Sequence, residues 1–399
     1  MVTDKSYVEY RSTEKKLLHP VETIVAALYK ALLTDGVIDG FLTLTEKKAG
    51  GGMQAVSVET SLDSSSINQT LLSEYLVGGL PRLLSVPKVI HSQLDGCFDQ
   101  RVAVVARPCD VRALVELSKR HQVSLGNLFI IGLECLGTVP VLDLMNVLKK
   151  REVDPSKVQS CERTPSEIIV SSAGKEPISL KIGQDVKLRE SCTRCGNRQP
   201  ILSDVLLSTW GKDLINNGTV LLRAQTERGK NCLSKAETMN LILPANNMPG
   251  PELENREKDI RRIEQTATEK LTKDNTEFAK LDGRERFKQF AKMIEPCTKC
   301  GLCIRACPVC WCKDCILLKK VKTIDPLLLH TTRLVHMGDT CVDCGKCDEN
   351  CPKGIPVSKI LYGFATELGK TTGYRPGLVL EQPSVRSAKF ILEKQHQLT

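Results

Sequence analysis

A cysteine pattern that occurs twice near the C-terminus constrains the fold of this 399-residue chain most strongly. The spacing is CxxCxxCxxxCP, and it is formed by Cys297, Cys300, Cys303 and Cys307 and again by Cys341, Cys344, Cys347 and Cys351. In such runs three thiolates bind one [4Fe–4S] cluster, and the cysteine before proline binds the neighbouring cluster. The spacing therefore predicts two clusters, one held by Cys297, Cys300, Cys303 and Cys351 and the other by Cys341, Cys344, Cys347 and Cys307.

Two other uses of so many cysteines fit the sequence less well. Disulfide scaffolds are normally short and secreted, whereas the first residues, MVTDKSYVEYRSTEKK, do not resemble a signal peptide. Structural zinc usually takes four ligands from paired CxxC motifs or from CxxC with histidine, which explains a repeated triple run poorly. No apolar run is long enough to span a membrane, so we expect a cytoplasmic protein without a transmembrane segment.

Between the two runs lie three further cysteines, Cys310, Cys312 and Cys315, in the sequence CPVCWCKDC. Two clusters do not need them. They are candidates for three ligands of another cluster, and the alternative is that they are free thiols.

The first 243 residues are expected to form an α/β domain, a mixed sheet with helices on its faces. Short apolar runs that alternate with amphipathic helical patterns carry this prediction. The expected helices cover 21–33 and 111–120, and the expected strands cover 37–44, 101–107, 128–134, 167–171, 178–182 and 219–223. No dinucleotide-binding GxGxxG fingerprint is present, and the glycine-rich stretch 47–54 is expected to be a turn or loop.

Four cysteines of this α/β domain suffice for a third cluster. Cys109 and Cys135 each follow a predicted strand, so both are expected at one edge of the sheet, and Cys192 and Cys195 form a CxxC pair. Cys109 also opens a helix, a position that lowers a thiol pKa and favours the thiolate. The alternatives are a redox-active Cys192/Cys195 dithiol and simple core cysteines.

A change in composition marks the end of this domain. The Pro- and Asn-rich stretch 243–252 is expected to be a linker. Residues 244–293 as a whole are expected to form this linker and one or two charged amphipathic helices. These helices either bridge the two domains or dock a partner subunit. Residues 294–399 are expected to form an α+β, two-cluster ferredoxin-like domain with a C-terminal tail. The net charge is +9, but acidic and basic residues are interleaved, so nucleic acid is not an expected partner.

Several strings in the sequence resemble a known family. ARPCDVRALVEL, NLFIIGLECLGTV and SCTRCGNRQP are similar to the coenzyme F420 hydrogenase/dehydrogenase beta-subunit family. The C-terminal strings CTKCGLCIRACPVCWCKDC, RLVHMGDTCVDCGKCDENCPKGIPVSKI and TGYRPG most resemble the beta subunit of F420-linked formate dehydrogenase and its bacterial relatives. The resemblance runs from about Val21 to Gly377.

The resemblance implies a flavoprotein electron-transfer subunit with FAD and three or four [4Fe–4S] clusters. Such a subunit exchanges a hydride between F420 and FAD and passes single electrons to a partner, which is a formate dehydrogenase or hydrogenase catalytic subunit or a heterodisulfide-reductase-like subunit. Relatives carry a Cys-Gly-Gly or Ser-Gly-Gly stretch near the first helix, where this chain has His19-Pro20. A flavin-free iron–sulfur relay is therefore one alternative, and a zinc-stabilised interaction module is another.

The sequence identifies no catalytic residue. Arg107, Asp110 and Arg112 flank Cys109 and are candidates for binding an acidic cofactor or tuning a cluster. The alternative is that Asp110 caps the helix and the arginines are surface charges.

Overall fold

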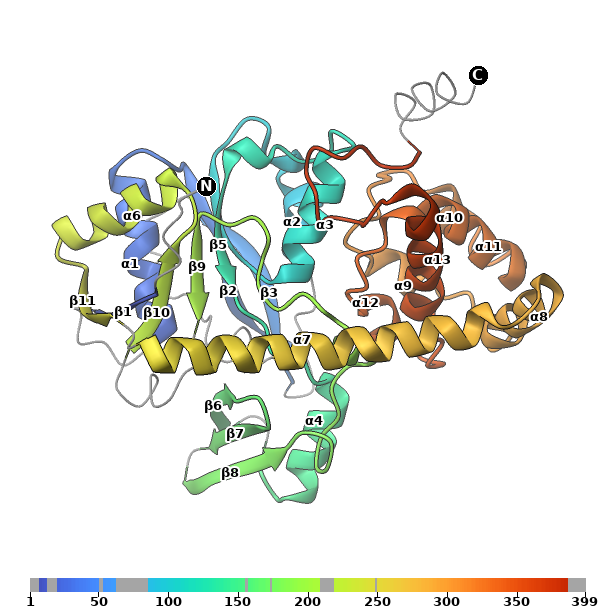
Figure 1. Ribbon diagram of the computed structural model, residues 1–399, viewed down its shortest axis with the longest axis horizontal. Helices are drawn as coiled ribbons and strands as arrows, with labels where there is room; N and C mark the ends of the chain where they lie inside the picture. The colour runs from blue at the N-terminus through green and yellow to red at the C-terminus, as the bar shows by residue number, and fades with distance from the viewer. Residues whose placement is uncertain are drawn as a thin grey trace.

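The computed structural model describes residues 7–12, 20–49, 53–61, 85–154, 157–172, 174–208, 219–247 and 250–386. The chain forms an α/β region, a small side lobe that is inserted into the α/β region between β5 and β9, and a helical C-terminal region (Figure 1). His19, the loop residues 50–52 and the tail after 386 lie outside the described residues.

The α/β region is built on a mixed eight-stranded sheet with the order β11-β1-β10-β9-β5-β4-β2-β3. Strands β2, β4, β5 and β9 pair in parallel, and the remaining pairs are antiparallel. The strands are β1 (Val8–Ser12), β2 (Gly40–Ala49), β3 (Met53–Ser61), β4 (Val102–Ala106), β5 (Leu128–Leu133), β9 (Val205–Ser208), β10 (Thr219–Ala224) and β11 (Ile242–Asn247). Every residue of β4, β5 and β9 is buried, as expected for central parallel strands. The expected mixed sheet is confirmed.

Helices pack on this sheet and supply most of its apolar partners. They are α1 (Pro20–Thr34), α2 (Val86–Gln93), α3 (Pro108–Ser118) and α6 (Glu227–Thr238), with short 3₁₀ turns η3 (Asp95–Cys97) and η4 (Leu125–Asn127). Helix α3 starts directly after β4 and continues the buried pattern of that strand.

The side lobe has a sheet and an apolar core of its own. It contains α4 (Val141–Lys150), β6 (Val158–Arg163), β7 (Glu167–Ser172) and β8 (Lys175–Lys181). Two of these strands were expected from the sequence, but they do not join the main sheet. A short helix, α5 (Glu190–Thr193), then returns the chain to the other two regions.

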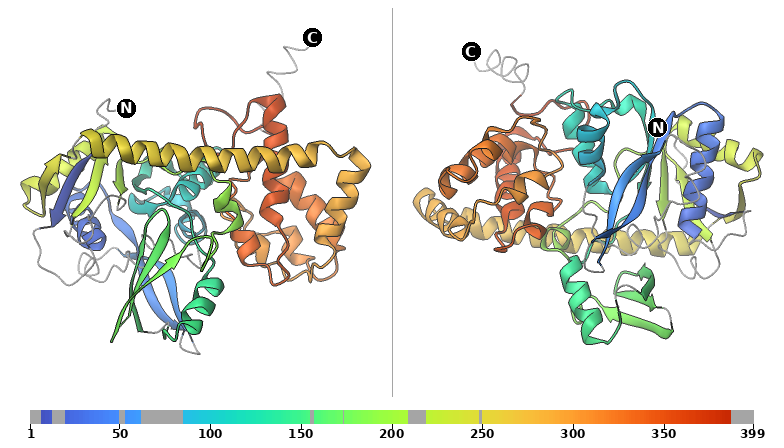
Figure 2. Two further views of the ribbon diagram at one scale, coloured as in Figure 1. Left: turned by 60° about the horizontal axis from the view of Figure 1, so that its bottom comes forward. Right: turned by 180° about the vertical axis from the view of Figure 1, so that it is seen from behind.

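Helix α7 (Gly250–Ala279) passes from the α/β region to the C-terminal region and is followed by α8 (Gly283–Ile294) (Figures 1 and 2). The expected charged helices are confirmed. The linker expected at 243–252 is wrong over residues 243–247, which belong to β11. That strand lies at the edge of the sheet, where a proline such as Pro244 is tolerated.

The C-terminal region contains α9 (Leu302–Arg305), α10 (Ile316–Lys319), α11 (Pro326–Met337), η6 (Gly338–Thr340), α12 (Lys346–Glu349) and α13 (Val357–Thr372). Residues 294–386 include no β-strand, so the expected α+β character is wrong for this described part. Buried residues four or more apart, such as Leu361 and Ala365 of α13, form the helical stripes that build its core instead.

No helix in the described parts of the chain is both long and apolar enough to cross a membrane.

Candidate functional site

The two cysteine runs fold into the same local backbone. Lys299 and Gly301 of the first run have φ values of 58° and 73°, and Asp343 and Gly345 of the second have 53° and 68°. Two left-handed residues in each run curl the chain so that its amide groups face inwards. The Lys299 N–H accordingly donates to Cys297 Sγ at 3.4 Å. Short helices α9 and α12 lie within the two runs, carry Cys303 and Cys347, and pack against each other.

The thiols predicted to share the first cluster are neighbours. Burial raises the pKa of Cys303, Arg333 opposes this effect, and the thiols of Cys297, Cys300 and Cys351 add to it. We call Cys297, Cys300, Cys303 and Cys351 the first set. Within it Cys300 is exposed.

The thiols predicted to share the second cluster also lie together. Burial and the Cys307 thiol raise the pKa of Cys344 to about 12. Burial raises the pKa of Cys341 and Cys347 well above the usual value, with contributions from other thiols of the group. We call Cys307, Cys341, Cys344 and Cys347 the second set. Each run thus contributes three cysteines to one set and its last cysteine to the other.

Cys109, Cys135, Cys192 and Cys195 form the third set. Cys109 lies in the first turn of α3, Cys135 follows β5, and the other two lie in and just after α5. Thr138 N–H and Gly137 N–H donate to Cys192 Sγ at 3.5 Å and to Cys135 Sγ at 3.4 Å. Gly137 has a φ of 94°, and an added Cβ there would lie 3.2 Å from Cys192 Cβ. A glycine is therefore needed for the two segments to approach.

The expected lowering of the Cys109 pKa is wrong. Burial raises the pKa of this thiol well above its usual value, and Asp110, Cys344, Cys135 and Cys195 raise it further. Burial removes the thiol from solvent and places it near other acidic groups, and both changes disfavour the thiolate. The influence of Cys344 also shows that the third set lies next to the second.

The three cysteines between the runs, Cys310, Cys312 and Cys315, do not all lie together as the members of the three sets do. Burial and the Cys307 thiol raise the pKa of Cys310 to about 12, with a smaller contribution from Cys315. Cys310 O also accepts a hydrogen bond from Lys88 Nζ at 2.9 Å, while Cys312 is exposed. The structure thus brings Cys310 and Cys315 together beside the second set.

The charged residues around Cys109 make contacts within the protein. Arg107 and Asp110 form a capping box at the start of α3, which confirms the capping alternative for Asp110. Arg112 is buried and donates to the carbonyl oxygens of Pro376 and Val342 at 2.9–3.1 Å. These contacts favour a structural role for the three residues over binding of an acidic cofactor.

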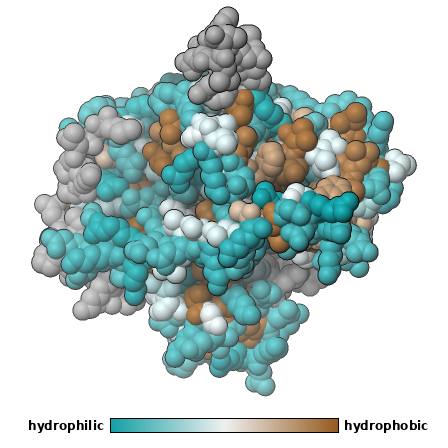
Figure 3. Space-filling model, turned by 45° about the vertical axis from the view of Figure 1, so that its right-hand side comes forward, coloured by the Kyte–Doolittle hydropathy of each residue, from teal (hydrophilic) through white to brown (hydrophobic). Residues whose placement is uncertain are grey.

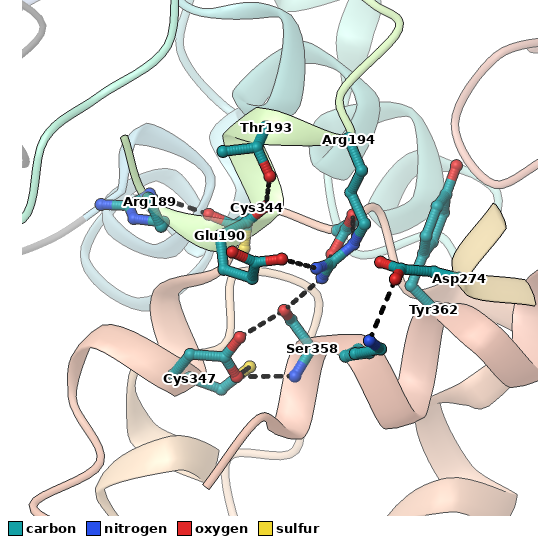
Figure 4. A network of polar contacts seen from close by, with 12 residues as sticks. Arg189, Glu190, Thr193, Arg194, Asp274, Cys344, Cys347, Ser358 and Tyr362 are labelled. Atoms are coloured by element: carbon teal, nitrogen blue, oxygen red, sulfur yellow. Dashed lines mark hydrogen bonds and ion pairs between the residues drawn. The ribbon is translucent and has the colours of Figure 1, made fainter. Parts of the chain in front are cut away.

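A buried polar network joins the second set to the segment that carries the third (Figure 4). Arg194 donates to both carboxylate oxygens of Asp343, at 2.7 and 2.8 Å, and to Ser358 Oγ at 3.0 Å. Arg189 donates to Cys344 O at 2.8 Å and pairs with Glu349 at 2.6 Å. Burial nevertheless raises the pKa of Asp343 to about 6, although Arg194 opposes the shift. The network fixes the second and third sets relative to each other.

Sequence reasoning missed the buried arginines around the three sets. Five of them have side-chain nitrogens that are buried without a hydrogen-bond partner, namely Arg163, Arg189, Arg194, Arg198 and Arg333. Arg198 Nη2 donates to Cys192 O at 3.0 Å. Thiols of the third set act to raise the pKa of Arg163 and of Arg189, so both guanidinium groups lie near this set. The available signal was the closeness of arginines to CxxC motifs, as in RESCTRCGNR.

Of the two histidines before the second run, His330 is buried and lies 3.3 Å from Cys297 Sγ through Nε2. Burial and Arg333 lower its pKa to about 4, so it is neutral at physiological pH.

A cavity of about 680 Å³ is lined in part by residues of α7. Its lining includes Ile130, Asp204, Gln225, Arg228 and Ile260 and contains none of the residues singled out from the sequence.

Among the described residues, no group of three or more His, Cys, Asp or Glu side chains is arranged to hold a single metal ion.

A mixed α/β sheet that delivers cysteines from its strand ends to a cysteine-rich helical region defines an electron-transfer subunit of an oxidoreductase. The family model for the C-terminal part of the coenzyme F420 hydrogenase/dehydrogenase beta subunit matches residues 99–246. A chain of the F420-reducing nickel–iron hydrogenase complex of Methanosarcina barkeri shares the fold, with a TM-score of 0.54 and 17% identity over 69% of this chain and 96% of that chain.

Two full-length relatives are more similar in sequence. The F420-dependent formate dehydrogenase subunit beta of Methanocaldococcus jannaschii is 28% identical over 386 residues, or 93% of this chain and 96% of the relative. The F420-dependent formate dehydrogenase 1 subunit beta of Methanococcus maripaludis is 30% identical over 373 residues, or 90% and 91%. The chain belongs to the coenzyme F420 hydrogenase/dehydrogenase beta-subunit family, as its motifs had indicated.

Proposed function

We propose that the protein is an iron–sulfur flavoprotein that transfers electrons between a hydride carrier and the catalytic subunit of a cytoplasmic oxidoreductase complex. The observation that carries this proposal is the succession of three four-cysteine sets, with the second set between the other two. Cys344 of the second set influences Cys109 of the third, and Arg333 faces thiols of both the first and the second.

The residues present fit [4Fe–4S] clusters. Each set offers four thiols, and inward-facing amides such as those of Lys299, Gly137 and Thr138 donate to the sulfurs. Buried guanidinium groups with unpartnered nitrogens stand beside the sets. Such donors and cations stabilise anionic thiolate-ligated clusters, which, when bound, supply one-electron transfer. Cys310 and Cys315 are candidates for ligands of a fourth cluster.

The FAD and F420 parts of the proposal rest on family membership. The two relatives above are named F420-dependent, and a flavin is the cofactor that takes a hydride and releases single electrons. The contacts of Arg107, Asp110 and Arg112 are satisfied inside the protein, so these residues are not part of the proposed flavin site. A flavin-free relay is the second candidate, favoured by His19-Pro20 in place of the glycine pair.

The partner is expected to contact the C-terminal region. Cys300 of the first set is exposed there, and the helices of the region expose Leu302, Ile316, Leu328, Val335 and Phe364. Apolar patches interrupt the hydrophilic surface on this side of the molecule (Figure 3). Electrons that reach the first set could pass here to a formate dehydrogenase or hydrogenase catalytic subunit, or to a heterodisulfide-reductase-like subunit.

Iron, acid-labile sulfide, zinc and flavin per chain, measured on one anaerobically purified sample of the native complex, test the proposal. Three [4Fe–4S] clusters predict about 12 irons and an equal amount of sulfide per chain. The flavoprotein proposal adds one FAD per chain. The same iron without flavin would select the flavin-free relay. Zinc without sulfide would overturn the proposal.

A further inference from the structure

Arg333, on α11, is a buried cation that has no carboxylate partner within the part of the chain that the structure describes. Its side chain is among the largest that are fully buried, with a relative exposure of 1%. Nη2 donates to Cys303 O at 3.2 Å, whereas Nε and Nη1 are buried with no hydrogen-bond partner. None of the ion pairs found among the described residues involves it.

Thiols of two different sets surround this guanidinium. Burial by itself would lower the pKa of Arg333, but the thiols of Cys303, Cys307 and Cys347 outweigh it and raise the pKa. Cys303 belongs to the first set, and Cys307 and Cys347 belong to the second. Arg333 therefore stands at the junction of the two sets.

An unpaired buried cation is strongly destabilising, so its charge must be balanced locally. Two thiolate-ligated clusters would supply that balance, because four thiolates and four sulfides outweigh the positive charge of the irons. Each cluster gains a further negative charge when it accepts an electron, and net charge is one of the factors that set cluster potentials. A fixed cation shared by both clusters would therefore favour the reduced form of each.

Arg189 occupies the corresponding position between the second and third sets, close to Cys192, Cys344 and Cys109. However, Arg189 pairs with the Glu349 carboxylate at 2.6 Å, so much of its charge is already compensated. Arg333 differs from Arg189 in that no carboxylate pairs with it among the described residues, so its charge is balanced by no acidic side chain there.

We propose that Arg333 is a positioning residue that raises the reduction potentials of both C-terminal clusters together. The inference rests on the proposed function, because it requires clusters at the first and second sets.

Arg333→Gln and Arg333→Lys test the proposal in the anaerobically purified complex, by redox titration followed by electron paramagnetic resonance. Coulomb's law, taken for scale at a separation of roughly 6 Å and an effective dielectric constant near 20, gives a decrease of about a hundredfold in the equilibrium constant for reduction when the charge is lost. At 59 mV per tenfold this is about 120 mV for each cluster. Arg333→Lys keeps the charge and is expected to stay near the wild-type potentials, with the third-set signal unchanged in both variants.

Arg305→Gln is the matched control, because Arg305 is an exposed arginine near the first set. Its solvent-screened charge is expected to change the equilibrium constant less than about threefold. If Arg333→Gln loses both clusters while Arg333→Lys keeps them at near-wild-type potentials, the requirement for charge is supported. Unchanged potentials in a fully loaded Arg333→Gln, or loss of clusters from both variants, would overturn the proposal. Absence of iron and sulfide from the wild-type protein would instead refute the proposed function itself.

Discussion

The two cysteine runs share one sequence pattern and one local backbone, but they differ in their surroundings. In the first run Cys300 is exposed, and the atoms nearest to an added Cβ at Gly301 belong to the Leu318 and Val321 side chains. In the second run Asp343 is buried against Arg194, and Gly345 lies against Arg189 and Ser191. The same motif is therefore partly exposed at the surface in the first run and buried between two regions in the second. Contacts with distant parts of the chain, and not the motif itself, determine which run is exposed and which is buried.

Removal of the cation that anchors the second run is expected to have the largest effect. Arg194→Met leaves Asp343 buried without its partner, which should cost about 3–5 kcal/mol of unfolding free energy. Lys299 has in the first run the position that Asp343 has in the second, and Lys299→Met removes only an exposed contact to Lys322 O, so it should cost less than about 0.5 kcal/mol. Anaerobic urea denaturation measures both, and equal losses would contradict the comparison.

The two glycines provide a second test. An added Cβ at Gly345 would lie 2.2 Å from Ser191 Oγ, whereas one at Gly301 would lie 3.0 Å from a movable Leu318 methyl group. Both substitutions carry left-handed strain. Gly345→Ala should therefore cost about 2–4 kcal/mol and Gly301→Ala about 1–2 kcal/mol. The shift in urea midpoint reports each cost, and a larger loss for Gly301→Ala would show that the packing difference is misassigned.

A third prediction concerns a contact that joins the regions without involving either run. Tyr374 Oη donates to the buried Glu116 Oε1 at 2.6 Å, and Glu116 also accepts from Gly377 N–H at 2.7 Å. Tyr374→Phe should cost about 1.5 kcal/mol, because it removes one hydrogen bond to a buried carboxylate. Thermal unfolding measures the loss. Iron content should stay at the wild-type value, and a loss of iron would mean that this contact also supports the cysteine sets.

The smallest expected effect is kinetic. Because the first set has an exposed thiol and the second is buried, a chelator should remove iron from the first cluster about fivefold faster. Electron paramagnetic resonance spectra recorded during incubation with a chelator would follow the two signals. Faster loss from the second cluster would reverse the assignment of outer and inner ends.

Local and periodic features of the fold could be predicted from the sequence. The left-handed positions at Gly301 and Gly345 follow from the motif, and the meeting of Cys109 and Cys135 follows from parallel strands that end at one edge. The pair of charged helices after residue 250 follows from apolar periodicity. Each of these features depends on spacing within a short segment.

Contacts between distant segments could not be predicted in the same way. Arg194 and Asp343 are 149 positions apart, and nothing near either residue specifies the other. The separate sheet of the side lobe depends on which strands pair, and the raised pKa of Cys109 depends on burial by the C-terminal region. The sequence predicted strands beside the helices in the C-terminal region, but its described part contains helices only. Apolar residues from several of these helices pack together in one buried cluster, and this packing is not visible in the sequence.

The exchange of last cysteines between the two runs has a consequence for biosynthesis. A chain that has been made only as far as residue 340 carries three thiols of the first set and a single thiol of the second. Neither set is complete until Cys347 and Cys351 leave the ribosome, within four residues of each other. Under the proposed ligation, neither site has a complete ligand set before these residues are made, so cluster insertion is expected to be late at both. A chain cut short after Cys347 would retain the ligands of the second set, but the first set would still lack its fourth thiol.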